Sequence, residues 1–557
     1  MVTALDYTHF PTHAELSALL ESWARESPDI LTLDSIGSSW QGRDIWLLTL
    51  TDPSTGPAAD KPALLVEANI HAAELTSSLS ALHLVHHLLS RQDDERCRRL
   101  LERTTLYVIP RLCPDGADAV LSERRYVRSS MRPYPSAAPQ PGLHERDVDG
   151  DGRVLFMRHP DPDGPWKRSA ADPRLLVRRD PDEYGGEYFR LFVEGEVLGH
   201  DGLSVPVAQP YEGLDLATNF HSDWADMPRR GPGAGGFAGS EPEIAALIRT
   251  VDDRPNITAY VTCHTFGAVH IHPPLNEDDD VPSLDTAIYE ELGQIASRRT
   301  GYQAMSYNAL KHVPYRVKGG QLAWFYHERG VLSWITELWN PLRAAGIEDF
   351  HPSRWLVDHD EADDIALLRW NDEELGGQGF VDWYTFDHPQ LGKVELGGWD
   401  LINYWYNPPL DRIEAEVARH TDWLLTLALT LPRLTIRGTT VEMAGMDVKR
   451  VAVAVANTGW LPTYGTKKAL ERQQCGPVVV TVEASNGVTI LSGAGPAELG
   501  QLAGRTGART TSTWWGHDPG TPDVAVHEVL VHAPNGGQIT VSARHPRAGL
   551  ALTTLEV

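Results

Sequence analysis

Four residues have the side-chain types and sequence positions that metal-assisted hydrolysis requires. Of the 23 histidines, only His71 begins an H-x-x-E sequence, which ends at Glu74. Two ligands three residues apart can face one ion, and two histidines with one glutamate and an open fourth position form a catalytic zinc arrangement. His264 ends a separate apolar run, 256–264, and Glu337 lies near the end of another, 331–339. These four residues are therefore candidates for one metal site.

Each of these residues also has a purely structural interpretation. The H-x-x-E sequence alone is a weak signal, because a helix cap or a surface pair has the same pattern. His264 taken alone is compatible with a hydrogen-bonded core histidine. Glu337 is compatible with a buried salt bridge, since a carboxylate inside an apolar strand needs a partner. Only the four residues together favour a metal centre.

Strands and helices alternate through the segments that must position these residues. The apolar run 62–70 predicts a buried strand that ends at His71, and the helical spacing of residues 71–91 follows it. Thr12 is expected to cap a helix over 12–26, with Glu15 completing a capping box. Further strands are expected over 104–112, 256–264 and 331–339, and further helices over 240–251 and 284–300. Ligands gather at the carboxyl ends of strands in open α/β sheets. We therefore predict an α/β/α sandwich with a mixed, mostly parallel sheet.

The pattern of residues divides the chain into parts. Residues 133–212 are rich in Pro, Asp, Gly and Arg, and predict a long, partly ordered insertion within a catalytic domain over 1–432. Residues 341–432 predict loops and a helix near 410–430. From 433 to 557, short alternating strands separated by Gly/Asn turns predict a β-sandwich.

Composition limits the classes of partner. The 49 basic and 76 acidic side chains give a formal net charge of −27, which disfavours nucleic acid and anionic membranes as partners. The four cysteines form no C-x-x-C pair and imply no disulfide framework. Neither a signal peptide nor an apolar run of membrane-spanning length is recognisable, so the cytoplasm is the expected location.

Several motifs in sequence order resemble the M14 zinc carboxypeptidases over roughly residues 10–345. His71-Ala-Ala-Glu74 resembles the family's first zinc motif, and His264 takes the place of its third ligand. The Pro-Asp-Gly turn, 114–116, resembles a family turn, and Glu337 lies 73 positions after His264, close to the family spacing. The segments 35–52, 213–220 and 315–326 resemble further family motifs.

The resemblance implies a role for each matched residue. Zinc would be held by His71, Glu74 and His264, with a water molecule in the open position, and Glu337 would be the general base. Arg128 would stabilise the oxyanion, with Arg132 as the competing choice. The remaining implied roles belong to Tyr315, a mobile catalytic tyrosine, and Asp215, a carboxylate that orients the first zinc histidine. Ordinary loop structure is the alternative for Arg128, Tyr315 and Asp215.

The sequence departs from the family where members bind the substrate's C-terminal carboxylate. Ala217 and Thr218 stand where members carry Asn-Arg, and neither can form the bidentate contact of an arginine. Three interpretations stay open. Another cation replaces the arginine, the substrate lacks a carboxylate, or the protein binds zinc without catalysis. The candidate replacement cations are Arg316, Lys318, Arg229 and Arg230.

Two further positions bear on the substrate. Ala73 lies where many members have arginine, which removes a second substrate-side charge. Leu322 occupies the position that lines the family's side-chain pocket, and favours an apolar or aromatic group there. A peptide or a small amide is the expected substrate, and the oligomeric state is left open.

Two segments outside these motifs could bind something else. Asp147, Asp149 and Asp151 alternate like the start of a calcium loop, but Arg158 stands where the final glutamate ligand belongs. Calcium or a solvated acidic turn are the two interpretations. Trp514, Trp515 and His517 form an aromatic loop that is either a binding loop or a packed one.

Overall fold

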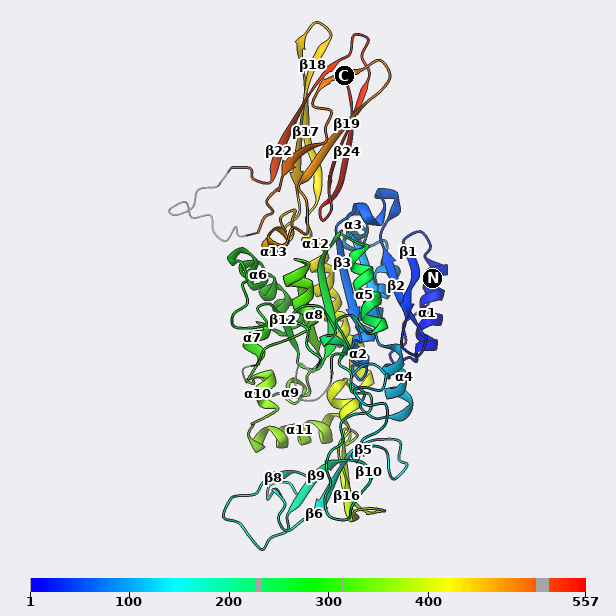
Figure 1. Ribbon diagram of the computed structural model, residues 1–557, viewed down its shortest axis with the longest axis vertical. Coiled ribbons are helices and arrows are strands. Elements are labelled where there is room, and N and C mark those ends of the chain that lie inside the picture. Colours follow the sequence, from blue (N-terminus) through cyan, green and yellow to red (C-terminus); the bar gives the residue numbers. More distant parts are fainter. Residues whose placement is uncertain (1, 227–232, 313–314, 507–519) are drawn as a thin grey trace.

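The computed structural model describes residues 2–226, 233–312, 315–506 and 520–557. Its centre is an α/β domain, with a C-terminal β-sandwich at one end and a smaller group of strands at the other (Figure 1). The central sheet has eight strands in the order β1-β2-β4-β3-β11-β14-β12-β13. These strands are β1 Leu31–Ser38, β2 Asp44–Leu50, β3 Ala63–Ala68, β4 Thr105–Ile109, β11 Ile257–Thr265, β12 Val269–His272, β13 Gln303–Ser306 and β14 Leu332–Leu338.

The central sheet is mixed and mostly parallel, as the sequence predicts. Strand β3 runs parallel to β4 and β11, and β11 runs parallel to β14, whereas β12 runs antiparallel to β14. The carboxyl ends of β3, β11 and β14 therefore meet at one edge of the sheet. His71 and Glu74 follow β3, His264 lies near the end of β11, and Glu337 lies near the end of β14.

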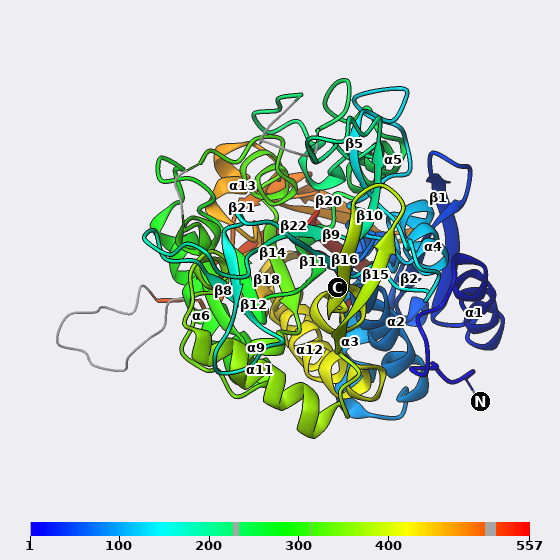
Figure 2. The ribbon, with the colours of Figure 1, turned by 90° about the horizontal axis from the view of Figure 1, so that it is seen from below.

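Helices cover both faces of this sheet, and Figure 2 shows α2 and α12 on one side of the strands and α5 on the other. The first face carries α1 His13–Glu26, α2 Leu75–Ser90, α3 Glu95–Arg103, α6 Ser283–Thr300 and α12 Leu410–Thr430. The second carries α5 Pro242–Asp252 and η4 Trp324–Glu328, and α8 Gln321–Ala323 directly precedes η4. The predicted capping box is confirmed, because Thr12 and Glu15 exchange both hydrogen bonds at the start of α1.

The insertion over 133–212 contains six short strands joined by longer loops. Strands from this segment join two from residues 380–399 in a six-stranded sheet of order β15-β16-β6-β9-β7-β8, and β5 pairs with β10. Loops were expected between residue 341 and the 410–430 helix, but residues 380–399 form the two strands that join this sheet, so that expectation is wrong. The elements are β5 Gly142–Glu145, β6 Phe156–Pro160, β7 Trp166–Arg168, β8 Leu176–Arg178, β9 Phe189–Val193, β10 Gly195–Leu198, β15 Phe380–His388 and β16 Gly392–Trp399.

The C-terminal strands form the predicted β-sandwich. Two four-stranded sheets, β17-β18-β22-β20 and β21-β19-β23-β24, enclose a core of valine, leucine, isoleucine and alanine side chains. The strands are β17 Leu434–Gly445, β18 Val448–Asn457, β19 Val478–Ala484, β20 Thr489–Ser492, β21 Ala497–Gly500, β22 Val524–His532, β23 Gln538–His545 and β24 Gly549–Glu556. Trp514, Trp515 and His517 lie outside the described residues.

The remaining α-helices are α4 Pro114–Glu123, α7 Tyr307–Leu310, α9 Pro341–Ala344, α10 Pro352–Trp355, α11 Glu361–Glu374 and α13 Lys467–Glu471. The longest of these, α11, packs against β15 of the insertion sheet. Among the helices that the structure describes, none has both the length and the apolar character needed to cross a membrane.

Candidate metal centre and active site

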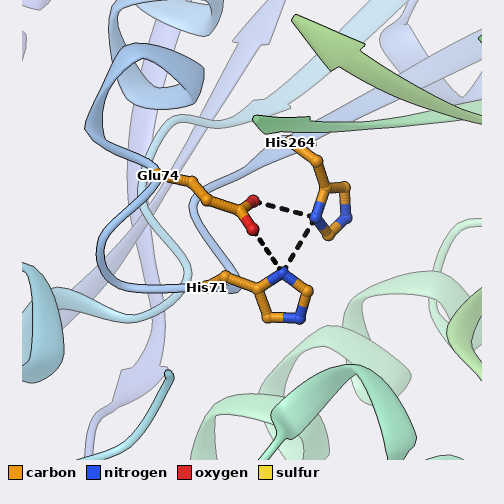
Figure 3. A group of neighbouring side chains, drawn as sticks. All are labelled: His71, Glu74 and His264. Carbon is orange, nitrogen blue, oxygen red and sulfur yellow. Dashed lines mark hydrogen bonds and ion pairs between the residues drawn. The ribbon is translucent and has the colours of Figure 1, made fainter. Parts of the chain in front are cut away.

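His71, Glu74 and His264 converge at the carboxyl edge of the central sheet (Figure 3). His71 lies in the loop after β3, Glu74 directly precedes α2, and His264 is the second-to-last residue of β11. The Nδ1 atom of His71 is 2.8 Å from Oε1 of Glu74, and Nδ1 of His264 is 3.0 Å from Oε2 of Glu74. The two Nδ1 atoms are 3.1 Å apart. All three side chains are buried.

This donor set fits a zinc ion. Donors bound at about 2.0–2.1 Å in a tetrahedral site lie roughly 3.3 Å from one another, and the observed separations of 2.8 to 3.1 Å are close to this value. Burial opposes ionisation of Glu74, but His71 and His264 lower its pKa below the usual value. Two ring nitrogens and one carboxylate oxygen thus face a common point, which is what a catalytic zinc site requires.

Asn69 holds the loop that carries the first two ligands. Its backbone is left-handed, with φ 59°. From there its Nδ2 donates to the carbonyl oxygens of His71 at 2.8 Å, Ala72 at 3.3 Å and Glu74 at 3.1 Å. One amide therefore fixes the path of the backbone through the H-x-x-E sequence.

The Pro-Asp-Gly turn is held by hydrogen bonds to the segment after β1. Asp115 accepts hydrogen bonds from Oγ of Ser39 at 2.7 Å, the backbone nitrogen of Gln41 at 2.8 Å and Nη1 of Arg43 at 2.7 Å. Two of the motifs that carried the family resemblance, 35–52 and 114–116, thus contact each other.

Asp215 and Arg128 surround the outer side of His71. Nε2 of His71 is 3.2 Å from Oδ1 of Asp215, and Arg128 donates to Oδ2 of Asp215 from Nε at 3.2 Å and Nη2 at 3.0 Å. Asp215 caps the short helix η3, Leu216–Thr218, by accepting from the backbone nitrogen of Ala217. A carboxylate on Nε2 leaves Nδ1 of His71 free for a metal.

Glu337 lies beside the three ligand candidates. In the parallel pairing of β11 with β14, it is the register partner of His264. Gly267 makes room for it, because a Cβ atom there would lie 2.9 Å from the Cβ of Glu337. Burial raises the pKa of the Glu337 carboxyl above its usual range, although the His264 imidazole opposes the shift. A carboxyl with a raised pKa next to a metal site can exchange protons near neutral pH.

A pocket of about 110 Å³ opens at this centre. Ala217 and Thr218 are part of its wall, and the Thr218 hydroxyl donates to the carbonyl oxygen of Asp215. Among the described residues that line it, Arg128 is the one arginine or lysine. The lining comprises His71, Arg128, Asp215, Ala217, Thr218, His264, Leu275, Tyr307, Val317, Gly320, Gln321, Leu322, Ile335 and Glu337.

Two predicted substrate-binding arginines lie elsewhere. Arg132 forms a two-point ion pair with Glu241, at 2.7 and 2.6 Å. Arg316 is exposed and pairs with Asp223 and Asp278. Neither lines the 110 Å³ pocket. Arg229 and Arg230 lie outside the described residues.

Tyr315, the predicted mobile tyrosine, lies one contact away from the pocket. Its hydroxyl is 3.0 Å from the hydroxyl of Tyr307, and Tyr307 itself is part of the lining. Tyr307 was not among the site residues predicted from the sequence. Tyr126 and Tyr406, whose rings are 5.2 Å apart beside Arg128, were not predicted either. Tyr126 could have been suspected from its position two residues before Arg128, whereas nothing in the sequence links Tyr406 to the site.

The three aspartates of the insertion come together as the calcium hypothesis requires, with carboxylate oxygens within 4.8 Å of one another. The turn also supports itself without an ion. Asp147 accepts from the backbone nitrogens of Gly150 and Gly152, and Asp149 accepts from that of Asp151. Both interpretations from the sequence are compatible with this geometry, and calcium stays a prediction.

Comparisons with known proteins agree with this architecture. The family model described as zinc carboxypeptidase, peptidase family M14, matches residues 16–352. A domain of unknown function, DUF8731, matches residues 433–556. Zinc carboxypeptidase A 1 of Drosophila melanogaster is 31% identical over 137 residues, which are 24% of this chain and 31% of that protein. Carboxypeptidase M of Mus musculus is 30% identical over 136 residues, 24% of this chain and 30% of that protein.

The matched segments thus span about a third of the length of these curated relatives. Among solved structures, thrombin-activatable fibrinolysis inhibitor is similar at 16% identity and a TM-score of 0.44, over 76% of this chain and 74% of that one. Carboxypeptidase A from Helicoverpa armigera is similar at 18% identity and a TM-score of 0.41, over 61% and 66%.

The fold and the family comparison together define the class. The protein has the mixed α/β/α architecture, with a set of metal-ligand candidates at the carboxyl edge of its sheet. Because the family model covers more than half of the chain, the protein belongs to the zinc carboxypeptidase family. The resemblance identified from the sequence motifs is confirmed.

Proposed function

We propose that this protein is a zinc-dependent hydrolase of peptide or amide bonds. The observation that carries the proposal is the cluster of His71, Glu74 and His264 at a pocket of about 110 Å³, which His71, His264 and Glu337 line. His71, Glu74 and His264 are suitable zinc ligands. Glu337 is a carboxyl with a pKa that is raised by burial. Family membership supports the same chemistry.

The residues of the site have separate tasks in this proposal. Zinc bound by His71, Glu74 and His264 would supply Lewis acidity toward water and the scissile carbonyl. Glu337 accepts a proton from the attacking water and returns it to the leaving amine. Arg128, fixed by Asp215, presents a cation to the developing negative charge on the carbonyl oxygen.

The pocket favours a substrate without a free carboxylate at this position. Its wall includes Leu275, Val317, Leu322 and Ile335, and Arg128 is its single described arginine or lysine. Arg316, a candidate replacement cation, and Arg132, the competing choice for the oxyanion arginine, are paired with other carboxylates outside the pocket. We therefore propose a small, neutral, apolar group next to the scissile amide, as in a blocked peptide or a small amide.

A paired hydrolysis assay tests this proposal. Zinc-loaded protein is given N-blocked apolar dipeptides as free acids and as C-terminal amides, and products are measured by mass spectrometry. Faster cleavage of the amides is the expected result. Faster cleavage of the acids would show that another cation binds the carboxylate. Cleavage of neither by zinc-loaded protein would favour a zinc-binding protein without catalysis.

We also propose a structural calcium ion at Asp147, Asp149 and Asp151. The supporting observation is the approach of their carboxylates. At fixed zinc concentration, millimolar calcium should raise the thermal midpoint of the native protein but not of an Asp149→Asn, Asp151→Asn variant, because an ion that binds only the folded state stabilises it. Equal midpoints with and without calcium would leave the acidic turn as the correct interpretation.

A further inference from the structure

Glu67 is a buried carboxyl to which the proposed mechanism assigns no task. It lies within β3, four residues before His71, and its side chain has no exposed surface. Its Oε2 atom receives three hydrogen bonds, from the hydroxyl of Tyr260 at 3.0 Å, the hydroxyl of Thr262 at 2.8 Å and Nε2 of Gln321 at 2.9 Å. A carboxyl buried at such cost calls for an explanation.

Thr262 connects this carboxyl to the third ligand candidate. Thr262 and Glu67 are register partners in the parallel pairing of β3 with β11. Thr262 and His264 are two residues apart, so their side chains lie on the same face of β11. Oγ1 of Thr262 is 3.0 Å from Nε2 of His264. A continuous path therefore runs from Glu67 through Thr262 to His264.

The directions of these hydrogen bonds fix the protonation of the imidazole. An amide nitrogen can only donate, and Oε2 of Glu67 receives the Tyr260 hydroxyl as well as Nε2 of Gln321, which is the pattern of an oxygen that carries no proton of its own. The single proton of the Thr262 hydroxyl then points to Glu67, and its lone pairs face His264. Nε2 of His264 must therefore carry the ring proton, which leaves Nδ1 without one. That Nδ1 atom is the one directed at Glu74 and His71.

We propose that Glu67 and Thr262 are positioning residues that set the tautomer and the ring orientation of His264 for zinc. Asp215 contacts Nε2 of His71 directly, and the Thr262 hydroxyl, oriented by Glu67, contacts Nε2 of His264. The same carboxyl also anchors Gln321, which adjoins Leu322 in the pocket wall. The inference rests on the proposed zinc site, and it concerns metal affinity rather than turnover.

Substitution of Thr262 gives the sharpest test, with zinc affinity of the apo-protein measured by competition with a chromogenic chelator. Thr262→Val keeps the shape and removes both hydrogen bonds, and should weaken zinc binding by about 10- to 100-fold. Thr262→Ser keeps the hydroxyl and should stay within about threefold of the native protein. Thr258→Val is the matched control, because it removes a buried hydroxyl of the same strand that bonds to Asn256 and Arg547 instead.

Cobalt substitution supplies a readout that a general loss of stability would not produce. The visible absorption of bound Co²⁺ depends on ligand geometry, so Thr262→Val should shift the spectrum and Thr262→Ser should not. Native affinity and an unshifted spectrum in Thr262→Val would overturn the inference. Equal weakening in both Thr262 variants would overturn it too, since the hydroxyl would then be irrelevant.

A double-mutant cycle tests whether Glu67 acts through Thr262. Glu67→Met should weaken zinc binding, and combining it with Thr262→Val should add little further loss, because both changes break one path. Fully additive losses would assign Glu67 a role separate from His264. If Glu67→Met does not fold, the Thr262 variants decide. Failure of the native protein to bind zinc would instead refute the proposed function itself.

Discussion

Two buried carboxyls at the site are driven toward opposite protonation states by their surroundings. Burial acts on both, but His71 and His264 lie in direct contact with Glu74 and lower its pKa. Glu337 has no such contact, and burial raises its pKa. Environments that separate the pKa values of neighbouring carboxyls assign them different tasks. Glu74 is suited to bind a cation, and Glu337 to carry a proton.

This difference leads to a prediction for Glu337→Gln. The amide keeps the size of the side chain and cannot accept a proton, so turnover should fall by about 10²- to 10⁴-fold. Zinc content should stay unchanged, because Glu337 is not among the three ligand candidates. Turnover and bound zinc are measured on the same preparation.

Glu243→Gln is the control for that variant. Glu243 is fully buried, and burial raises its pKa to about 7, but it bonds to the backbone nitrogen of Trp40 and lies outside the pocket lining. Its substitution should leave turnover close to the native value. Full activity of Glu337→Gln with zinc in place would remove Glu337 from the mechanism.

At the scale of elements, the sequence predicted the parts that local patterns determine. The apolar run 62–70 became β3, and the residues after it became the ligand loop and α2. The Thr12 capping box formed because both partners lie within one turn. The strands that carry His264 and Glu337 were predictable since apolar runs in a buried parallel strand are nearly continuous.

The insertion could not be predicted in this way. Its strands are three to five residues long and carry many charged side chains, so no clear alternation marks them. One partner of β6 is β16, which lies more than 200 residues later in the sequence. Tyr406, near Arg128, comes from the same distant region. Pairing over such separations is set by tertiary packing rather than by local propensity.

Gly116 in α4 lies where two segments of the site pack closely together. A Cβ atom there would lie 2.0 Å from the carbonyl oxygen of Ser129 and 2.6 Å from the Cβ of Ala72. Gly116→Ala should therefore push apart the ligand loop and the segment that carries Arg128. The expected loss is about 1–3 kcal/mol in the free energy of unfolding, together with weaker zinc binding, measured by urea denaturation and chelator competition.

Gly438→Ala is the matched control, because an added Cβ atom at Gly438 meets nothing within 4 Å. Its unfolding midpoint and zinc affinity should match those of the native protein. If Gly116→Ala behaves in the same way, the close contact between the Pro-Asp-Gly turn and the ligand loop does not support the site.

At the scale of the whole molecule, the C-terminal sandwich contacts the far end of a segment that begins in the pocket wall. Arg547 is buried and donates to the carbonyl oxygens of Gly330 at 2.6 Å, Arg329 at 2.5 Å and Tyr464 at 3.2 Å. The segment from Gln321 to Gly330 starts in the pocket lining and ends at this contact. This contact was not predictable from the sequence, because an isolated arginine in a turn is usually a solvated surface residue.

Arg547→Met should reveal how much this contact contributes. Methionine fills the space but removes the Arg547 donor from three carbonyl oxygens. The Gly330 and Tyr464 carbonyls keep hydrogen bonds from Thr466, so the Arg329 carbonyl is the one left without a donor. The free energy of unfolding should therefore fall by about 1–3 kcal/mol, measured by urea denaturation. Arg544→Met is the control, since the Arg544 side chain is 56% exposed and its ion pair with Asp60 contributes little. A KM that rises in Arg547→Met but not in Arg544→Met would show that the sandwich also holds the pocket wall. Equal unfolding midpoints for the two variants would mean that the sandwich is attached to the catalytic domain without stabilising it.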